Sequence, residues 1–228
     1  MPTNADGKTF GIMKKVCLFI LLSLYFATVC AGFDLQTAIP LVETKTLPLD
    51  FNRELAFRAN HCLDNPNNAI PDKMYENFQL TDSFSTRDNT DTMLNLCFKC
   101  KLSSDLYLCL VRIGGVIEPV TYVLTSVDYN YRVMQSLKVG VKYANTYIKQ
   151  FRITDNREVY VYRLVPTSTA SVLFDTFKSV EAYVTETVYT IDSAGQFILA
   201  SPEKRVSSTR TFSHDELENM KQNLWELY

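Results

Sequence analysis

The sequence has little glycine, two histidines and one tryptophan, and these shortages exclude several kinds of enzyme site. Seven glycines occur in 228 residues, and none stands in a P-loop or dinucleotide-binding pattern, so nucleotide cofactors are not expected. The histidines, His61 and His214, accompany no G-x-S-x-G motif, and no paired carboxylates stand out. We therefore predict no enzyme, no catalytic residues, no cofactor and no metal. A hydrolase whose triad is assembled only in space is a minor alternative.

Clustered basic residues are also lacking. The chain has 23 Lys and Arg against 25 Asp and Glu, a net charge of −2. Because nucleic-acid binding needs clustered cations to neutralise phosphates, we expect no nucleic-acid partner. A hydrophobic fraction of 46%, with 14 Phe and 13 Tyr, favours a packed core over disorder.

One long apolar run is present, near the start of the chain. Residues 13–31 carry two lysines, then the run from Val16 to Val29, and then the small residue Ala31. The run is shorter than the roughly 20 residues that a membrane-spanning helix needs. We interpret residues 1–31 as a secretory signal peptide with a short polar extension, cut before Gly32. We expect a secreted, extracellular protein with no membrane span after cleavage; a retained anchor is the alternative.

Four of the six cysteines remain after this cleavage: Cys62, Cys97, Cys100 and Cys109. In an oxidising compartment an even number favours two disulfides, with three possible pairings. The spacing Cys97-x-x-Cys100 also suits zinc or a redox pair, but the second close pair of a zinc site is missing. With a three-residue turn after the first long strand, Cys97 would lie opposite Cys109, and Cys62 is an equally credible partner for either.

The chain changes character near residue 93. Residues 32–92 are rich in turn-forming residues, which predicts an irregular, partly helical approach segment with two helical turns over Phe51–Phe57. Residues 93–212 carry runs of Val, Tyr, Phe, Thr and Ile separated by turns, which predicts an antiparallel β domain. The predicted strands are 93–102, 106–113, 120–127, 131–139, 141–148, 150–154, 158–165, 180–191 and 196–200. Residues 180–191 also fit a helix, but their β-branched residues favour a strand.

The last sixteen residues have the pattern of an amphipathic helix. Ser213 and Glu216 have the spacing of a capping box. An apolar stripe follows at Leu217, Met220, Leu224 and Leu227. We therefore predict a C-terminal helix over 213–228 packed on the β domain.

The number of strands determines the fold class that we predict. Eight or nine strands with short connections indicate mostly antiparallel pairing, and closure of the sheet would remove its exposed edges. The prediction is a mainly β protein with an up-and-down barrel, and a two-sheet sandwich is the alternative.

Aromatic side chains are concentrated on the predicted strands. Three pairs are spaced to share a strand face: Tyr129 with Tyr131, Tyr143 with Tyr147, and Tyr160 with Tyr162. Tyrosine on a strand often packs in a core with its hydroxyl at the rim, but inside a barrel such rows could line a pocket for one small apolar ligand. We take these six tyrosines and Arg132 as candidate ligand-binding residues. Arg132, Arg152 and Arg163 would either meet a ligand carboxylate or face water.

The stretch TYVLTSVDYNYRVM, Thr121 to Met134, resembles the second conserved block of the lipocalins, a barrel strand of the form x-V-L-x-T-D-Y-x-x-Y. The matching residues are Val123, Leu124, Asp128, Tyr129 and Tyr131, with Val127 in place of the threonine and the closing tyrosine one residue early. The G-x-W that opens lipocalin barrels is missing. The resemblance implies that Asp128, Tyr129 and Tyr131 are wall residues of a barrel that binds or transports a small hydrophobic molecule.

Two functions follow from these features. The first is a secreted binding protein that carries or sequesters a small hydrophobic ligand. The second is a secreted, disulfide-bonded β module that acts by protein–protein interaction and has no ligand cavity. The expected partner is accordingly a small hydrophobic molecule or an extracellular protein.

Overall fold

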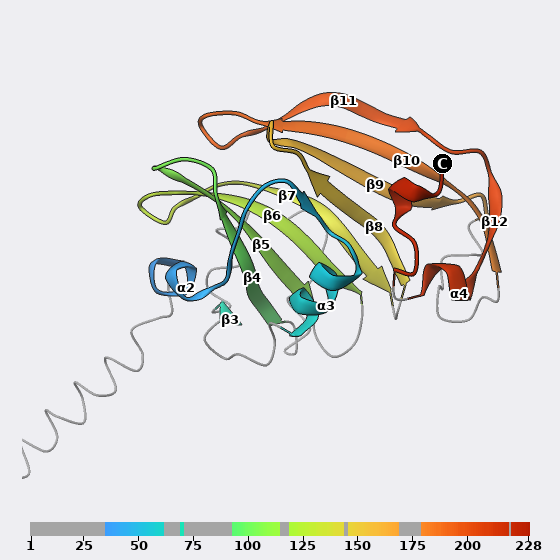
Figure 1. The fold of residues 1–228 in the computed structure, drawn as a ribbon, viewed down its shortest axis with the longest axis horizontal. Helices are drawn as coiled ribbons and strands as arrows, with labels where there is room; N and C mark the ends of the chain where they lie inside the picture. The colour runs from blue at the N-terminus through green and yellow to red at the C-terminus, as the bar shows by residue number, and fades with distance from the viewer. Residues whose placement is uncertain are drawn as a thin grey trace, which may run out of the picture. The chain divides into compact units, whose positions relative to one another are not determined.

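A large mixed β-sheet dominates the computed structural model of the chain (Figure 1). The structure describes residues 35–61, 69–70, 93–114, 119–143, 146–168, 179–218 and 220–228. All of these belong to one unit, residues 34–228. The predicted signal peptide and Cys62 lie outside the described residues. Within the described ranges, no helix is long and apolar enough to cross a membrane.

Nine strands follow one another across the sheet by hydrogen bonding. In spatial order they are β1 (Thr44–Lys45), β4 (Met93–Lys101), β5 (Leu106–Gly114), β6 (Val120–Asp128), β7 (Val133–Tyr143), β8 (Thr146–Ile153), β9 (Glu158–Pro166), β10 (Ser179–Ile191) and β11 (Phe197–Arg205). Three strands pair off this path: β2 (Leu49–Asp50) with β8, β3 (Ala69–Ile70) with β4, and β12 (Arg210–Ser213) with β10. The helices are α2 (Leu35–Leu41), α3 (Arg53–His61), the single turn α4 (His214–Leu217) and the 3₁₀ turn η6 (Leu224–Glu226). The mainly β prediction is confirmed.

The barrel prediction is wrong because the sheet does not close. The outer edge of β4 pairs with β1 and β3 instead of with the last strand. At the other end, β11 is an edge strand that carries Pro202 and three charged residues, features that discourage pairing with another strand. The two-sheet alternative also fails, since all these strands belong to one sheet. That sheet is nevertheless curled. The β8–β9 and β4–β5 turns lie close together, since Arg157 Nη2 in the first donates to the Leu102 carbonyl in the second over 2.7 Å.

Most of the predicted turns are present, but the predicted break between strands at Gly140 is not. The hairpin β4–β5, the turn at Asp155-Asn156 and the left-handed Gly195, with φ of +79°, are confirmed. β7 runs through Gly140, whose added Cβ would lie 3.0 Å from the Tyr122 ring on β6. The glycine therefore makes room for an aromatic ring and does not end a strand.

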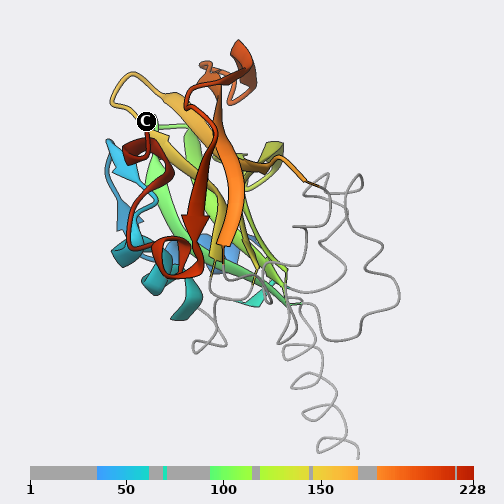
Figure 2. The same cartoon turned by 90° about the vertical axis from the view of Figure 1, so that its right-hand side faces the viewer.

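Residues 179–191 form the long strand β10, which confirms the prediction of a strand and not a helix there. β12 was not predicted. It pairs with the first residues of β10, beyond the end of β11, and β10 and β12 run side by side in both views (Figure 2). The predicted strand 150–154 belongs to β8, and β11 extends to Arg205.

The approach segment supplies part of the core. Phe51 is fully buried, and its ring lies 5.0 Å from that of Phe151 and 4.8 Å from that of Tyr122, centroid to centroid. The Phe51 N–H donates to the Phe151 carbonyl over 3.0 Å. The side chains of Leu55 and Ala59 from α3 join the same cluster. Aromatic rings thus fill the face of the sheet that a barrel ligand would have occupied.

Helix α3 confirms the predicted helical turns, although it starts at Arg53 and not at Phe51. Asn52 caps it, since its Oδ1 accepts a hydrogen bond from the Leu55 N–H over 3.0 Å. The helix ends at His61.

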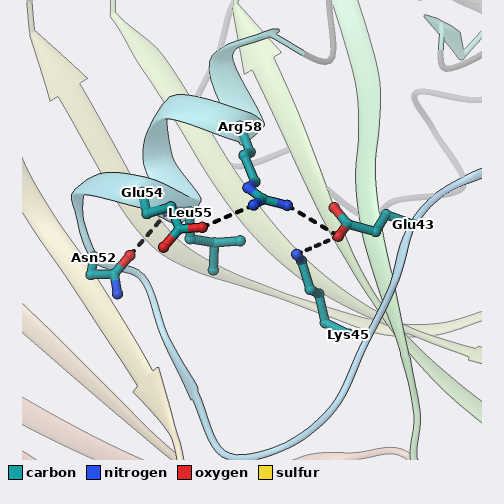
Figure 3. A network of polar contacts seen from close by, with 6 residues as sticks. All are labelled: Glu43, Lys45, Asn52, Glu54, Leu55 and Arg58. Carbon is teal, nitrogen blue, oxygen red and sulfur yellow. Dashed lines mark hydrogen bonds and ion pairs between the residues drawn. The ribbon is translucent and has the colours of Figure 1, made fainter.

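Ion pairs join α3 to the strand segment before it (Figure 3). Arg58 lies 2.9 Å from Glu54 and 3.3 Å from Glu43, and Lys45 pairs with the same Glu43. Each exposed pair of this kind contributes roughly 0–1 kcal/mol, so the cluster adds little to the stability of the fold. Every cation in this cluster has a carboxylate partner.

No disulfide links two of the described cysteines, so the predicted framework is not seen there. A bulge between Leu96 and Phe98 shifts the hairpin register, and Cys109 lies opposite Lys99 instead of Cys97. Cys100 and Cys109 are free, buried thiols on opposite faces of the hairpin, because side chains alternate along a strand. Burial raises the pKa of Cys100 to about 11 and that of Cys109 to about 12, which keeps both thiols protonated.

The C-terminal capping box is confirmed. The Ser213 side chain accepts from the Glu216 N–H over 3.3 Å, and Glu216 accepts from the Ser213 N–H over 2.8 Å. These bonds and the nearby Arg210 lower the pKa of the Glu216 carboxyl group.

The long C-terminal helix is wrong beyond its first turn. Glu218 forms a β-bridge with Thr146, and Met220 adopts a left-handed φ of +52°, so the helix cannot continue. The Leu224 N–H instead donates to Gln150 Oε1 over 3.1 Å. The apolar stripe is still buried at Met220 and Leu224, so hydrophobic burial is preserved without helical structure.

Candidate functional site

One face of β8 and β9 changes from apolar to cationic along its length. Phe151 and Ile153 on β8 are core residues, and Lys149 lies on their face because side chains alternate along a strand. On β9, Arg163 follows the buried Val161 in the same way. Lys149 and Arg163 are directly paired across the two strands. The apolar face therefore ends in two opposed cations.

A third cation, Lys138 of β7, completes a cluster around a hollow of about 300 Å³. The remaining lining residues are Val141, Tyr143 and Ile148, so the walls are apolar and aromatic. We refer to this as the Lys149 hollow. Among the described residues that line it there is no carboxylate.

A second hollow, of about 390 Å³, shares Arg163 with the first. It is lined by Arg163, Val165, Tyr183, Thr185, Glu203 and Arg205. Cross-strand pairing runs from Lys149 to Arg163, from Arg163 to Thr185 and from Thr185 to Arg205. The two hollows thus follow one line across β8 to β11, and we call them together the cationic groove.

Glu203, the one carboxylate among the described residues that line the groove, is already engaged. It accepts a 2.6 Å hydrogen bond from the Thr185 hydroxyl and lies 3.9 Å from Arg163 Nη1. Arg205 is also held, since its guanidinium stacks 4.4 Å from the Tyr183 ring centroid and donates to the Ser207 carbonyl. By contrast, the Lys149 ammonium forms no hydrogen bond or ion pair within the described part of the chain.

The surroundings of Lys149 destabilise the charged form of its side chain. Burial, followed by the charges of Lys138 and Arg163, lowers the pKa of Lys149 to about 8, while Glu203 acts in the opposite direction. Burial and Arg163 also lower the pKa of Lys138. Like charges directly opposed on neighbouring strands are destabilising. A bound anion would relieve this repulsion, which the carboxylates of the cluster at Arg58 already do for their own cations (Figure 3).

Two of the residues named from the sequence lie in the groove. Tyr143 lines the Lys149 hollow, and Arg163 is shared by both hollows. Tyr147 does not share the face of Tyr143, because a turn separates them and Tyr147 pairs with Lys142. The Tyr147 ring is in the core, and its hydroxyl accepts from Asn60 Nδ2 over 2.8 Å.

The other named residues lie elsewhere. Tyr129, Tyr131 and Arg132 lie in the β6–β7 turn, where Asp128 accepts from the Arg132 N–H over 2.8 Å and Tyr129 is 62% exposed. They are not in the strand wall that the lipocalin resemblance implies.

Tyr160 and Tyr162 lie on the opposite face of β9 from Arg163. Tyr162 packs 5.6 Å from the Trp225 ring, and Arg152 lies over the same indole at 5.3 Å and pairs with Asp50 at 2.8 Å. The six tyrosines therefore do not converge on one pocket.

Sequence reasoning missed Lys138 and Lys149. The available signal was Lys149 itself, a cation two and four residues before Phe151 and Ile153 on an otherwise apolar strand face. The pairing of Lys149 with Arg163 follows the regular register of the β8–β9 hairpin. The approach of Lys138 could not be read from the sequence, because a bulge interrupts the register between β7 and β8.

Metal binding and similarity to known proteins add no further assignment. Within the described ranges, no group of three or more His, Cys, Asp or Glu is placed to hold a metal ion. No protein-family model, no curated protein and no solved structure matches the chain.

Proposed function

We propose that the chain is a secreted binding protein that holds a small anionic ligand with an apolar part in the cationic groove. The observation that carries the proposal is the convergence of Lys138, Lys149 and Arg163 on one hollow that no carboxylate lines among the described residues. Burying the Lys149 ammonium beside two other cations is costly unless an anion pairs with it.

The lining of the Lys149 hollow defines the ligand chemistry. A carboxylate, sulfonate or phosphate would accept charge-assisted hydrogen bonds from the Arg163 guanidinium and the Lys149 ammonium. The hydrocarbon part would lie against Val141 and Ile148. A hollow of about 300 Å³ matches the lower end of the usual range for small-molecule sites.

Two features support this choice over an internal barrel cavity. The signal-peptide pattern of residues 1–31 supports a role outside the cell, where carriers and sequestering proteins work. The face around Phe51 is filled by aromatic rings, which leaves a surface groove as the place for a ligand.

A protein-binding module is the second candidate function, and one observation favours it. The side chains of Ile198 and Leu199 on the edge strand β11 are 50% and 55% exposed. Both residues precede Pro202 and the charged end of β11, and this first part of the edge strand can pair with a strand of another protein. Stable capture of an extracellular protein that a charged substitution at Leu199 abolishes would favour this function over the first.

Titration with 8-anilinonaphthalene-1-sulfonate, an aromatic anion whose fluorescence rises on binding, tests the primary proposal. We expect saturable binding at one site, weakened by added salt because the contacts are electrostatic. Arg163→Gln should weaken binding about 5- to 10-fold, equivalent to about 1–1.4 kcal/mol.

Arg132→Gln is the matched control, since it removes the same charge from the exposed β6–β7 turn. It should leave the affinity unchanged. Equal losses in both variants, or fluorescence that never saturates, would contradict the proposal.

A further inference from the structure

Lys149 is placed as a chemically active amine as well as a cation. Its side chain is half-buried between Lys138 on β7 and Arg163 on β9, inside a hollow with apolar walls. Within the described residues its ammonium group forms no hydrogen bond or ion pair, and Glu203, which favours the charged form, does not outweigh the burial and the two cations. An amine that is desolvated and next to other cations is the usual arrangement for a nucleophilic lysine.

We infer that Lys149 captures the carbonyl group of an anionic aldehyde or ketone as an imine. The inference rests on the proposed function, because Arg163 and Lys138 must first bind the acidic group of that ligand. The ligand class is thereby narrowed to small carbonyl compounds that carry a carboxylate or phosphate. The capture is reversible and needs no cofactor.

The chemistry balances without an oxidant or a reductant. The lone pair of the neutral Lys149 amine attacks the carbonyl carbon, and the carbonyl oxygen takes a proton to give a carbinolamine. Loss of the hydroxyl group as water, together with the remaining amine proton, forms the C=N bond. Addition of water reverses each step and releases the ligand.

The groups that face Lys149 determine how its reactivity depends on pH. They are Lys138 from β7, Arg163 from β9, Glu203 from β11 and the Tyr143 hydroxyl at the end of β7. With its pKa at about 8, roughly 10% of the Lys149 amine is neutral at pH 7. An ordinary lysine with a pKa of about 10.4 is only about 0.04% neutral at that pH. Lys149 should therefore react far faster than other lysines near neutrality.

Labelling with pyridoxal 5′-phosphate, an aldehyde that carries a phosphate, tests the inference on the full chain. After reduction with borohydride, peptide mass spectrometry should find the adduct on Lys149 at least about tenfold above any other lysine. Between pH 8 and pH 6 the labelling rate should fall about tenfold per pH unit at the lower end, as the neutral amine disappears. Lys149→Arg, which keeps the charge, should abolish this labelling, whereas Lys142→Arg on β7 should not change it.

Pyridoxine 5′-phosphate, which has an alcohol in place of the aldehyde, distinguishes anion binding from imine formation, because it can bind through its phosphate but cannot form an imine. If it competes with the naphthalene sulfonate probe while Lys149 gains no adduct, the imine is overturned and the anion-binding function stands. If neither phosphate compound binds and the sulfonate titration is also flat, both are overturned. Labelling spread evenly over the lysines would also overturn the inference.

Discussion

Replacing Phe51 by alanine is expected to lower the free energy of unfolding by about 3–5 kcal/mol, the usual cost of removing a buried aromatic ring. Phe51 is fully buried and contacts the rings of Phe151 and Tyr122. Its removal would leave a void where residues from the approach segment join β6 and β8. Urea unfolding followed by circular dichroism measures the loss as a lower midpoint at an unchanged slope.

Phe57→Ala is the matched control, because Phe57 lies on the same segment but is 62% exposed. Its loss should be below about 1 kcal/mol, as for most surface substitutions. Similar losses in the two variants would show that the approach segment is not part of the core. If Phe51→Ala cannot be purified folded, Phe51→Leu should still lose more stability than Phe57→Leu.

Replacing Lys149 by glutamine is expected to stabilise the free protein and to weaken its binding of the naphthalene sulfonate. The ligand site is built at the expense of stability, since Lys149 is half-buried and faces Lys138 and Arg163. A shift of the pKa from 10.5 to about 8 corresponds to a gain of about 1–3 kcal/mol when the charge is removed. Binding should weaken at least about 20-fold, because a central charged contact is lost.

The pH dependence of this gain has a definite sign. Below pH 8 Lys149 is charged in the folded and unfolded chains, so the folded state bears the full repulsion. Between pH 8 and about 10.4 the unfolded chain binds more protons at this residue, and stability rises with pH. The stability difference between Lys149→Gln and the wild type should therefore be largest at pH 7 and shrink toward pH 10.

Comparison with the variant is needed because buried tyrosines act in the opposite direction at high pH. Burial raises the pKa of Tyr122, so unfolding releases its proton more easily and stability falls above about pH 10. That contribution is common to both proteins and cancels in their difference. A Lys149→Gln protein that is less stable than the wild type at pH 7 would contradict the account.

The sequence was sufficient for features that depend on local chemistry. Alternating β-branched and aromatic residues identified most strands, and Asp155-Asn156 and Gly195 marked turns that the structure contains. The capping box at Ser213 was also correct, because it depends on residues only three positions apart. The reading of Gly140 failed, since the Tyr122 ring that requires it comes from another strand.

Features that depend on pairing between distant parts of the chain could not be predicted from the sequence. Closure of the sheet was predicted from the need to cover its edges, yet β1 and β3 cover the edge of β4. A long C-terminal helix was predicted from an apolar stripe that the chain buries without helical structure. Arg163 was named as a residue that could meet a carboxylate, but its neighbours Lys138 and Lys149 come from other strands.

The crystal structure of the protein soaked with 4-bromobenzoate tests the central claim most directly, because the anomalous signal of bromine locates the ligand without bias. We predict a bromine peak in the Lys149 hollow against Val141 and Ile148, with the carboxylate within hydrogen-bonding distance of Arg163 or Lys149. A bromine peak among the rings around Phe51, or at the Tyr129–Arg132 turn with the hollow empty, would contradict the account.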